Sequence, residues 1–183
     1  MANAAGSGSV RPVISAEQIQ KRVKEMARQI SDDYQAALSG KNLHVLGIME
    51  NGFVFMADLI RSLEVPTVCQ FIKPHYAKRV SGETALEEIF FSHELELHGQ
   101  HVLLIEGVLH SGVTAEFLMS NLRGRGVASV KLATLLDRQA ARRVALQPDY
   151  FGYLVDEHFF VGYGMASAEQ QFRNLPYVGA WQE

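Results

Sequence analysis

The stretch VLLIEGVLHSGVTAEFL, from Val102 to Leu118, decides the fold because it joins a buried strand, a turn and the start of a helix. Gly112 lies in the turn, just before the helical pattern begins. A turn of this kind often binds phosphate in α/β proteins, since the helix N-terminus presents unpaired N–H groups. Glu106, Gly107 and His110 also lie in the turn. They raise the question of whether it carries out chemistry or only binds.

Strands and helices alternate around this stretch. Apolar runs of strand length recur at residues 43–48, 67–73, 88–97, 101–105, 129–136, 149–155 and 159–164. Apolar residues at helical spacing occupy residues 15–34, 53–63 and 114–125. The alternation predicts an α/β fold with a mostly parallel central sheet flanked by helices. Ligands of such sheets bind at the carboxyl ends of the strands.

The composition is that of a globular domain, with 48% hydrophobic and 20% charged residues. The net charge of -3 argues against a general nucleic-acid partner, and no apolar run is long enough to span a membrane. We expect a flexible arm over residues 1–13 and a single domain over residues 14–183. The only cysteine, Cys69, lies in an apolar run, which predicts a small buried residue and a reducing, cytoplasmic location.

Residues 111–114 have the composition of a phosphate site. Ser111, Gly112, Val113 and Thr114 can turn backbone N–H groups towards an anion, and two of them add hydroxyl groups. Neither GxxxxGK nor GxGxxG occurs in the chain, which argues against ATP and dinucleotide sites. A plain strand-to-helix turn capped by Ser111 remains the alternative.

Six segments extend this reading along the chain: ISAEQIQKRVKEMARQIS, GFVFMADLIRSLEVP, GQHVLLIEGVLHSGVT, VKLATLLDR, PDYFGYLVDEHFFVGYG and FRNLPYVG. In order and spacing they resemble the 6-oxopurine (hypoxanthine-guanine) phosphoribosyltransferases over residues 14–181. The resemblance implies the type I phosphoribosyltransferase fold, a sheet core with a small hood. It also implies purine salvage, in which a purine base and 5-phosphoribosyl-1-diphosphate (PRPP) form a nucleotide with Mg²⁺, and a homodimer or homotetramer.

The phosphoribosyl loop of that family has two acids, then two variable residues and Asp-Thr-Gly-x-Thr, and here it is altered. Glu106 keeps the first acid, and the resemblance assigns it a ribose hydroxyl or a Mg²⁺ ion. Gly107 replaces the second acid. His110 takes the place of the aspartate near purine N7, where an imidazole could transfer a proton. His110 could equally bond a nucleotide without turnover, or lie exposed in the loop.

The diphosphate positions also depart from the family. Glu50 stands where the family has a lysine, beside a peptide bond of unusual geometry, and Asn51 replaces a glycine. An anion in place of a cation reverses the Coulomb interaction with diphosphate unless Mg²⁺ bridges the two. Ala166 replaces an aspartate that holds Mg²⁺ and cannot bind a metal itself. Arg173 matches an arginine near the diphosphate, with one residue inserted before it.

The purine positions agree better. Arg138 replaces a lysine that donates to the 6-oxo group, and a guanidinium is a bulkier, planar donor. Phe159 matches the aromatic ring that stacks on the purine, and Phe160 matches a position whose backbone reads the base. Ordinary core packing is the alternative for both phenylalanines. We interpret Arg142 and Arg143 as a solvated basic turn.

A polar, glycine-containing loop is expected over residues 74–84, long enough to act as a lid. His75 and Tyr76 fall where the family has a Ser-Tyr pair that closes over the reacting centre.

Two functions remain open on the sequence. One is an active phosphoribosyltransferase with His110 as the acid-base residue and Mg²⁺ held by Glu106, Glu50 and the substrate. The other is a non-catalytic sensor or scaffold that binds a purine nucleotide such as IMP or GMP. Because Gly107, Glu50 and Ala166 depart from the family together, the sequence favours weakened or altered activity.

Overall fold

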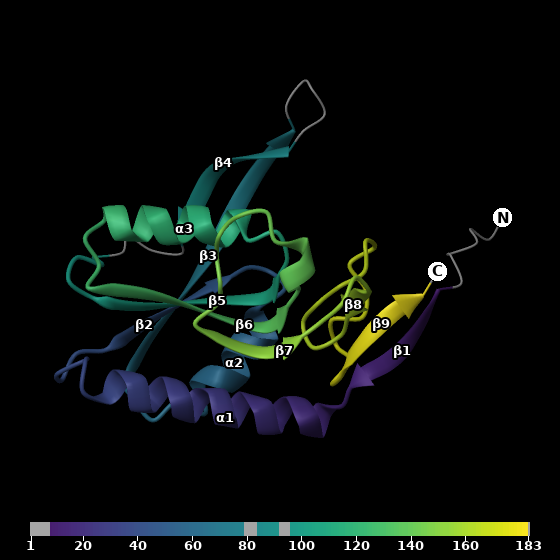
Figure 1. The fold of residues 1–183 in the computed structure, drawn as a ribbon, viewed down its shortest axis with the longest axis horizontal. Coiled ribbons are helices and arrows are strands. Elements are labelled where there is room, and N and C mark those ends of the chain that lie inside the picture. Colours follow the sequence, from purple (N-terminus) through teal and green to yellow (C-terminus); the bar gives the residue numbers. More distant parts are fainter. Residues whose placement is uncertain (1–7, 79–83, 92–95, 183) are drawn as a thin grey trace.

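A six-stranded sheet forms the centre of the computed structural model, which describes residues 8–78, 84–91 and 96–182, with backbone alone between 75 and 91 (Figure 1). Its strands, in spatial order, are β4 (Thr84–Phe91), β3 (Thr67–Lys78), β2 (Leu43–Ile48), β5 (His101–Leu109), β6 (Ser129–Asp137) and β7 (Tyr150–Leu154). The five strands from β3 to β7 are parallel, and β4 runs antiparallel to β3. The predicted α/β fold with a mostly parallel sheet is confirmed.

Helices cover both faces of the sheet. Figure 1 shows α1 (Ala16–Gln35) and α2 (Phe53–Ile60) on one side and α3 (Val113–Gly124) on the other. Successive side chains of a strand point to opposite faces of the sheet, so the strands contribute to two apolar clusters, one on each face. In β5, Leu103 packs with α1, whereas Leu104 packs with α3.

The first helix shows how local sequence sets an element. Ser15 caps α1, since its hydroxyl accepts the Gln18 N–H at 3.3 Å and its own N–H donates to the Gln18 side chain at 2.8 Å. The buried residues of α1 recur every three or four positions, at Ile19, Val23, Met26, Ala27, Ile30, Ser31 and Tyr34. No helix in the described part of the chain is long and apolar enough to cross a membrane.

A second, small antiparallel sheet forms the hood. It contains β1 (Ser9–Ile14), β9 (Val178–Gln182) and β8 (Phe159–Val161), with β9 in the middle. The expected flexible arm over residues 1–13 is therefore wrong for residues 9–13, which belong to strand β1; residues 9–12 pair with β9. The backbone of this segment pairs with residues 178–182, close to the other end of the sequence. Residues 1–7 lie outside the described part.

Two further expectations need correction. The loop predicted over residues 74–84 is strand up to Lys78, and strand β4 begins at Thr84, opposite Lys78 in the antiparallel pair. Residues 79–83 lie outside the described part. Cys69 is exposed rather than buried, as is Phe71 two residues further along the same strand face. The apolar run thus predicted the strand correctly, but it did not predict which of its side chains are buried.

Candidate functional site

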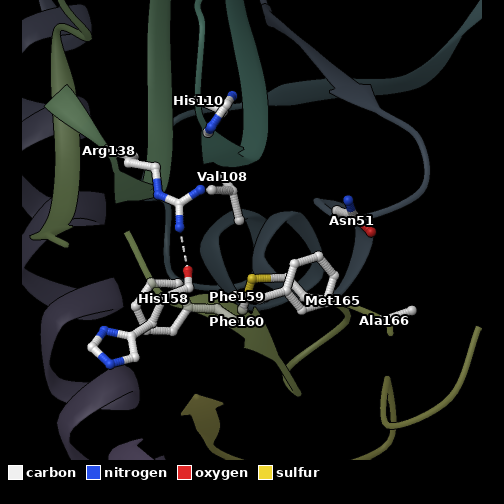
Figure 2. A pocket seen from close by; sticks show the side chains of 9 residues that line it. All are labelled: Asn51, Val108, His110, Arg138, His158, Phe159, Phe160, Met165 and Ala166. Carbon is white, nitrogen blue, oxygen red and sulfur yellow. Dashed lines mark hydrogen bonds between the residues drawn. The ribbon is translucent and has the colours of Figure 1, made fainter. Parts of the chain in front are cut away.

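Three segments that follow strands of the central sheet meet at its carboxyl edge, as the parallel topology predicts, and a fourth segment joins them from the small antiparallel sheet. They are residues 49–52 after β2, 110–112 after β5, 138–144 after β6 and 162–166 after β8. Together with the start of β8 they enclose a cavity of about 400 Å³, shown in Figure 2. Its lining includes Asn51, His110, Arg138, Phe159 and Ala166. Residues predicted for the base and for the acid-base group thus share one cavity, whereas Glu106, the residue predicted for the metal, is not among its described lining residues.

The turn before α3 has the shape of an anion site. Gly112 has a φ of 78°, in the left-handed region that favours glycine, and is the N-cap of α3. The first helical hydrogen bond runs from the Glu116 N–H to Gly112 O at 2.9 Å. The N–H groups of residues 113–115 therefore precede the helical ladder. Ser111 Oγ accepts one of them, from Val113, at a long 3.4 Å.

His110 is an exposed residue at the mouth of this cavity. Partial desolvation lowers the pKa of its imidazole, and the positive charges of Arg138, Arg143 and Arg142 lower that pKa further. A lowered pKa keeps the ring neutral at neutral pH. A neutral imidazole has one nitrogen that can accept a proton and one that can donate a hydrogen bond.

The side of the cavity that is predicted to face the base contains Arg138 and Phe159. Arg138 Nε donates to Asp156 O at 2.8 Å, and one terminal nitrogen donates to His158 O (Figure 2). These bonds fix the guanidinium plane and leave the second terminal nitrogen for a ligand. Phe159 is 51% exposed, whereas Phe160 is 9% exposed and belongs to the core. Ordinary core packing therefore applies to the Phe160 side chain but not to Phe159.

A second cavity, of about 210 Å³, lies between residues 49–51 and the end of β5. Two carboxyl groups line it, from Glu50 and Glu106, and no lysine or arginine is among its described lining residues. Glu106 Oε2 is fully buried without a hydrogen-bond partner, although the residue as a whole is partly exposed. Burial raises the pKa of Glu106 to about 8, against an opposing effect of Arg142. The Glu106 carboxyl is thus mostly protonated at neutral pH.

Arg173 and Lys73 both pair with Glu50. Glu50 Oε2 lies 3.1 Å from Arg173 Nη2, and Glu50 Oε1 lies 3.7 Å from Lys73 Nζ. The other acceptors of Arg173 are Asn51 Oδ1 at 2.9 Å, Gly164 O at 2.6 Å and Gln170 Oε1 at 2.7 Å. Each terminal nitrogen of Arg173 therefore donates twice within the protein. The Met49–Glu50 peptide is cis.

Three comparisons agree with this geometry. A family model described as the phosphoribosyl transferase domain matches residues 15–168. The hypoxanthine-guanine phosphoribosyltransferase of Bacillus subtilis is 32% identical over 91% of this chain and 90% of its own length. A crystal structure of the Bacillus anthracis hypoxanthine-guanine phosphoribosyltransferase superposes with a TM-score of 0.83 at 31% identity, covering 97% of this chain and all of the other.

The chain belongs to the hypoxanthine-guanine phosphoribosyltransferase family. A bifunctional TilS/HprT protein of Listeria innocua is 34% identical over 91% of this chain, which spans about a quarter (25%) of that protein's length. The type I fold and hood expected from the sequence are confirmed by the superposition.

Members of this family typically use Mg²⁺, and the residues here do not fit a protein-held Mg²⁺ ion. Ala166 offers no donor, Glu50 is paired with two cations, and Glu106 is mostly protonated. Among the residues that the structure describes, no three His, Cys, Asp or Glu side chains gather closely enough to hold a metal. The hypothesis that Glu106, Glu50 and the substrate together hold the ion stays a prediction.

Arg142 corrects another interpretation from the sequence. Its side chain is buried, pairs with the buried Asp137 and donates to His110 O at 2.8 Å. Only Arg143 is exposed. Sequence reasoning missed both Asp137 and Lys73. Asp137 lies in the segment VKLATLLDR, but nothing in that segment indicates its pairing with Arg142, and Lys73 lies in no recognisable motif. The lid residues His75 and Tyr76 lie in β3 by their backbone, and their side chains are outside the described part.

Gly107 allows the 49–52 turn to pack against β5. A Cβ atom at Gly107 would overlap Asn51 O and lie 3.2 Å from the Gly52 nitrogen. The loss of the family's second acid is therefore linked to the position of the neighbouring turn.

We expect Gly107→Ala to lower the free energy of unfolding by about 1–3 kcal/mol, because the new methyl group forces backbone apart. Urea unfolding of wild type and variant measures the difference. Gly124→Ala is the matched control, since nothing lies within 4 Å of the added carbon. Wild-type stability in Gly107→Ala would contradict the close approach.

Proposed function

We propose that this chain binds a purine 5′-monophosphate, IMP or GMP, and that its transfer of phosphoribosyl from PRPP is weakened. The observation that supports weak transfer is Glu50, which lines the second cavity at a position where the family has a lysine, with no lysine or arginine among the described lining residues. Transfer from PRPP requires room for a diphosphate that carries several negative charges. Glu50 supplies no positive charge to a diphosphate, and it holds Lys73 and Arg173 in ion pairs that compete with the diphosphate for these two cations.

Nucleotide binding retains the parts that it needs. The turn at residues 111–114 and the α3 N-terminus suit a 5′-phosphate. Arg138 has a terminal nitrogen to donate, which suits a 6-oxo group because a guanidinium cannot accept from a 6-amino group. Phe159 exposes its ring to the same cavity and can stack on the purine.

The weakened transfer is proposed to rely on His110. A neutral imidazole at the base cavity can accept a proton from the purine. On this proposal any remaining turnover depends on His110 and disappears in His110→Ala, whereas nucleotide binding persists. We also propose that the protein forms a homodimer or homotetramer, because its family does.

IMP and GMP should each raise the melting temperature without added Mg²⁺. At a ligand concentration about 100 times Kd the stabilisation is roughly 2.7 kcal/mol, which corresponds to about 5–10 °C for a domain of this size. Differential scanning fluorimetry measures the shift. AMP, which presents a 6-amino group to Arg138, should give a smaller shift. A flat response to both IMP and GMP would rule out the binding proposal.

A further inference from the structure

One segment makes several hydrogen bonds to the turn before α3, the proposed site of the 5′-phosphate (the phosphate turn). Residues 138–144, here called the strap, include the short 3-10 helix η1 (Gln139–Ala141). The strap donates to three successive carbonyl groups of the turn. These bonds run from Arg138 N–H to Leu109 O (3.0 Å), from Arg142 Nη1 to His110 O (2.8 Å) and from Arg143 N–H to Ser111 O (2.9 Å).

Arg142 makes the only one of these three bonds that depends on a side chain. Its side chain is 7% exposed, and its other terminal nitrogen pairs with Asp137, whose side chain is 3% exposed. Its Cδ atom would lie 2.9 Å from a Cβ atom at Gly112. Arg142 therefore fills the space next to Gly112 as well as holding the carbonyl of His110.

We propose that Arg142 is a positioning residue for the 5′-phosphate. If the His110 carbonyl oxygen pointed towards the phosphate, it would repel the anion. Because this oxygen accepts from Arg142, the phosphate faces N–H groups of the turn instead. The strap also begins at Arg138, which lines the base cavity. One segment thus links the two ends of the nucleotide. The inference rests on the proposed nucleotide binding.

Charge alone is the competing explanation, since Arg142 also adds positive charge near the phosphate turn. Arg142→Lys separates the two, because lysine keeps the charge but loses the planar fork that reaches His110 O and Asp137 together. A positioning role predicts a loss of phosphate recognition in Arg142→Lys, whereas a charge role predicts wild-type behaviour.

The test compares IMP with inosine, which has the same base and sugar but no phosphate. We expect Arg142→Lys to weaken IMP binding by roughly tenfold to a hundredfold, the range of a hydrogen bond to a charged group. Inosine affinity should stay within about twofold of wild type. Arg143→Lys is the matched control, because Arg143 is exposed and holds Ser111 through a backbone N–H that lysine keeps. Calorimetric titration measures all affinities.

A double variant keeps the test valid if Arg142→Lys does not fold. Asp137→Asn with Arg142→Gln removes both charges of the buried pair and leaves neither alone, and the same selective loss is expected. Equal losses for IMP and inosine, or wild-type IMP affinity in a folded variant, would overturn the role of Arg142 and leave the proposed function intact. Failure of the wild-type protein to bind IMP would overturn both.

Discussion

Glu50→Lys is expected to raise the affinity for PRPP by about tenfold to a thousandfold. The substitution removes a carboxylate from the second cavity and adds a cation there. It also releases Lys73 and Arg173, which Glu50 pairs with in the native protein. A charge contact at about 4 Å is worth roughly 4 kcal/mol at an effective dielectric constant of about 20, and solvent reduces this because the Glu50 side chain is 48% exposed.

The measurement is the binding of PRPP, followed by the rate of nucleotide formation from hypoxanthine. Glu25→Lys is a suitable control, because Glu25 also pairs with an arginine, is 49% exposed and lies on α1 away from both cavities. It changes the net charge by the same amount. Unchanged PRPP affinity in Glu50→Lys, or an equal rise in Glu25→Lys, would show that Glu50 does not exclude the diphosphate.

Full recovery of transfer is not expected from Glu50→Lys alone. Ala166 still offers no metal ligand, so Ala166→Asp is the natural second change. Gly107→Asp cannot simply be added, because its side chain would meet the backbone of Asn51. The three departures from the family thus differ in kind. Glu50 and Ala166 lack the cation and the metal ligand that the family has at these positions. Gly107 differs from them because the neighbouring turn packs directly against it.

Local patterns explain how much of the fold could be predicted. The capping box at Ser15 predicted the start of α1, and the apolar run at 43–48 predicted β2 (Leu43–Ile48) with its limits. Both signals lie within a few residues of the element that they describe. Strand β1 has no such signal, because its partner β9 lies some 170 residues away in the sequence. The small residues before it, MANAAGSG, suggested that the whole start of the chain is an arm, and only the tertiary pairing makes residues 9–14 a strand.

The site divides in the same way. Parallel topology placed His110, Arg138 and Asn51 at one edge of the sheet, and the structure has them around one cavity. The pairing of Arg142 with Asp137 could not be predicted, since two adjacent arginines usually indicate a solvated turn. Glu50 lies in the turn after β2, whereas its partners Lys73 and Arg173 lie in other parts of the chain. The sequence therefore suggested an unpaired anion at position 50, but the structure has Glu50 in two ion pairs.

Glu106 should make the protein less stable as pH rises, by about 2–4 kcal/mol between pH 4.5 and 8. Burial raises the pKa of this carboxyl to about 8 in the folded protein, from 4.5 in the unfolded chain. Between these values the folded state holds a proton that the unfolded state has released. Raising the pH therefore favours unfolding. The stabilising contribution is fully present below pH 4.5 and is lost by about pH 8.

Glu106→Gln isolates this effect, because glutamine has the same shape and cannot ionise. Urea unfolding at pH 5, 6, 7 and 8 should show the variant gaining stability over wild type at each step, up to a few kcal/mol. Glu64→Gln, at an exposed carboxyl, is the matched control. A difference between wild type and Glu106→Gln that stays constant with pH would mean that Glu106 is already ionised at pH 5. A metal could then bind Glu106 at neutral pH, so this measurement also tests why the second cavity does not suit Mg²⁺.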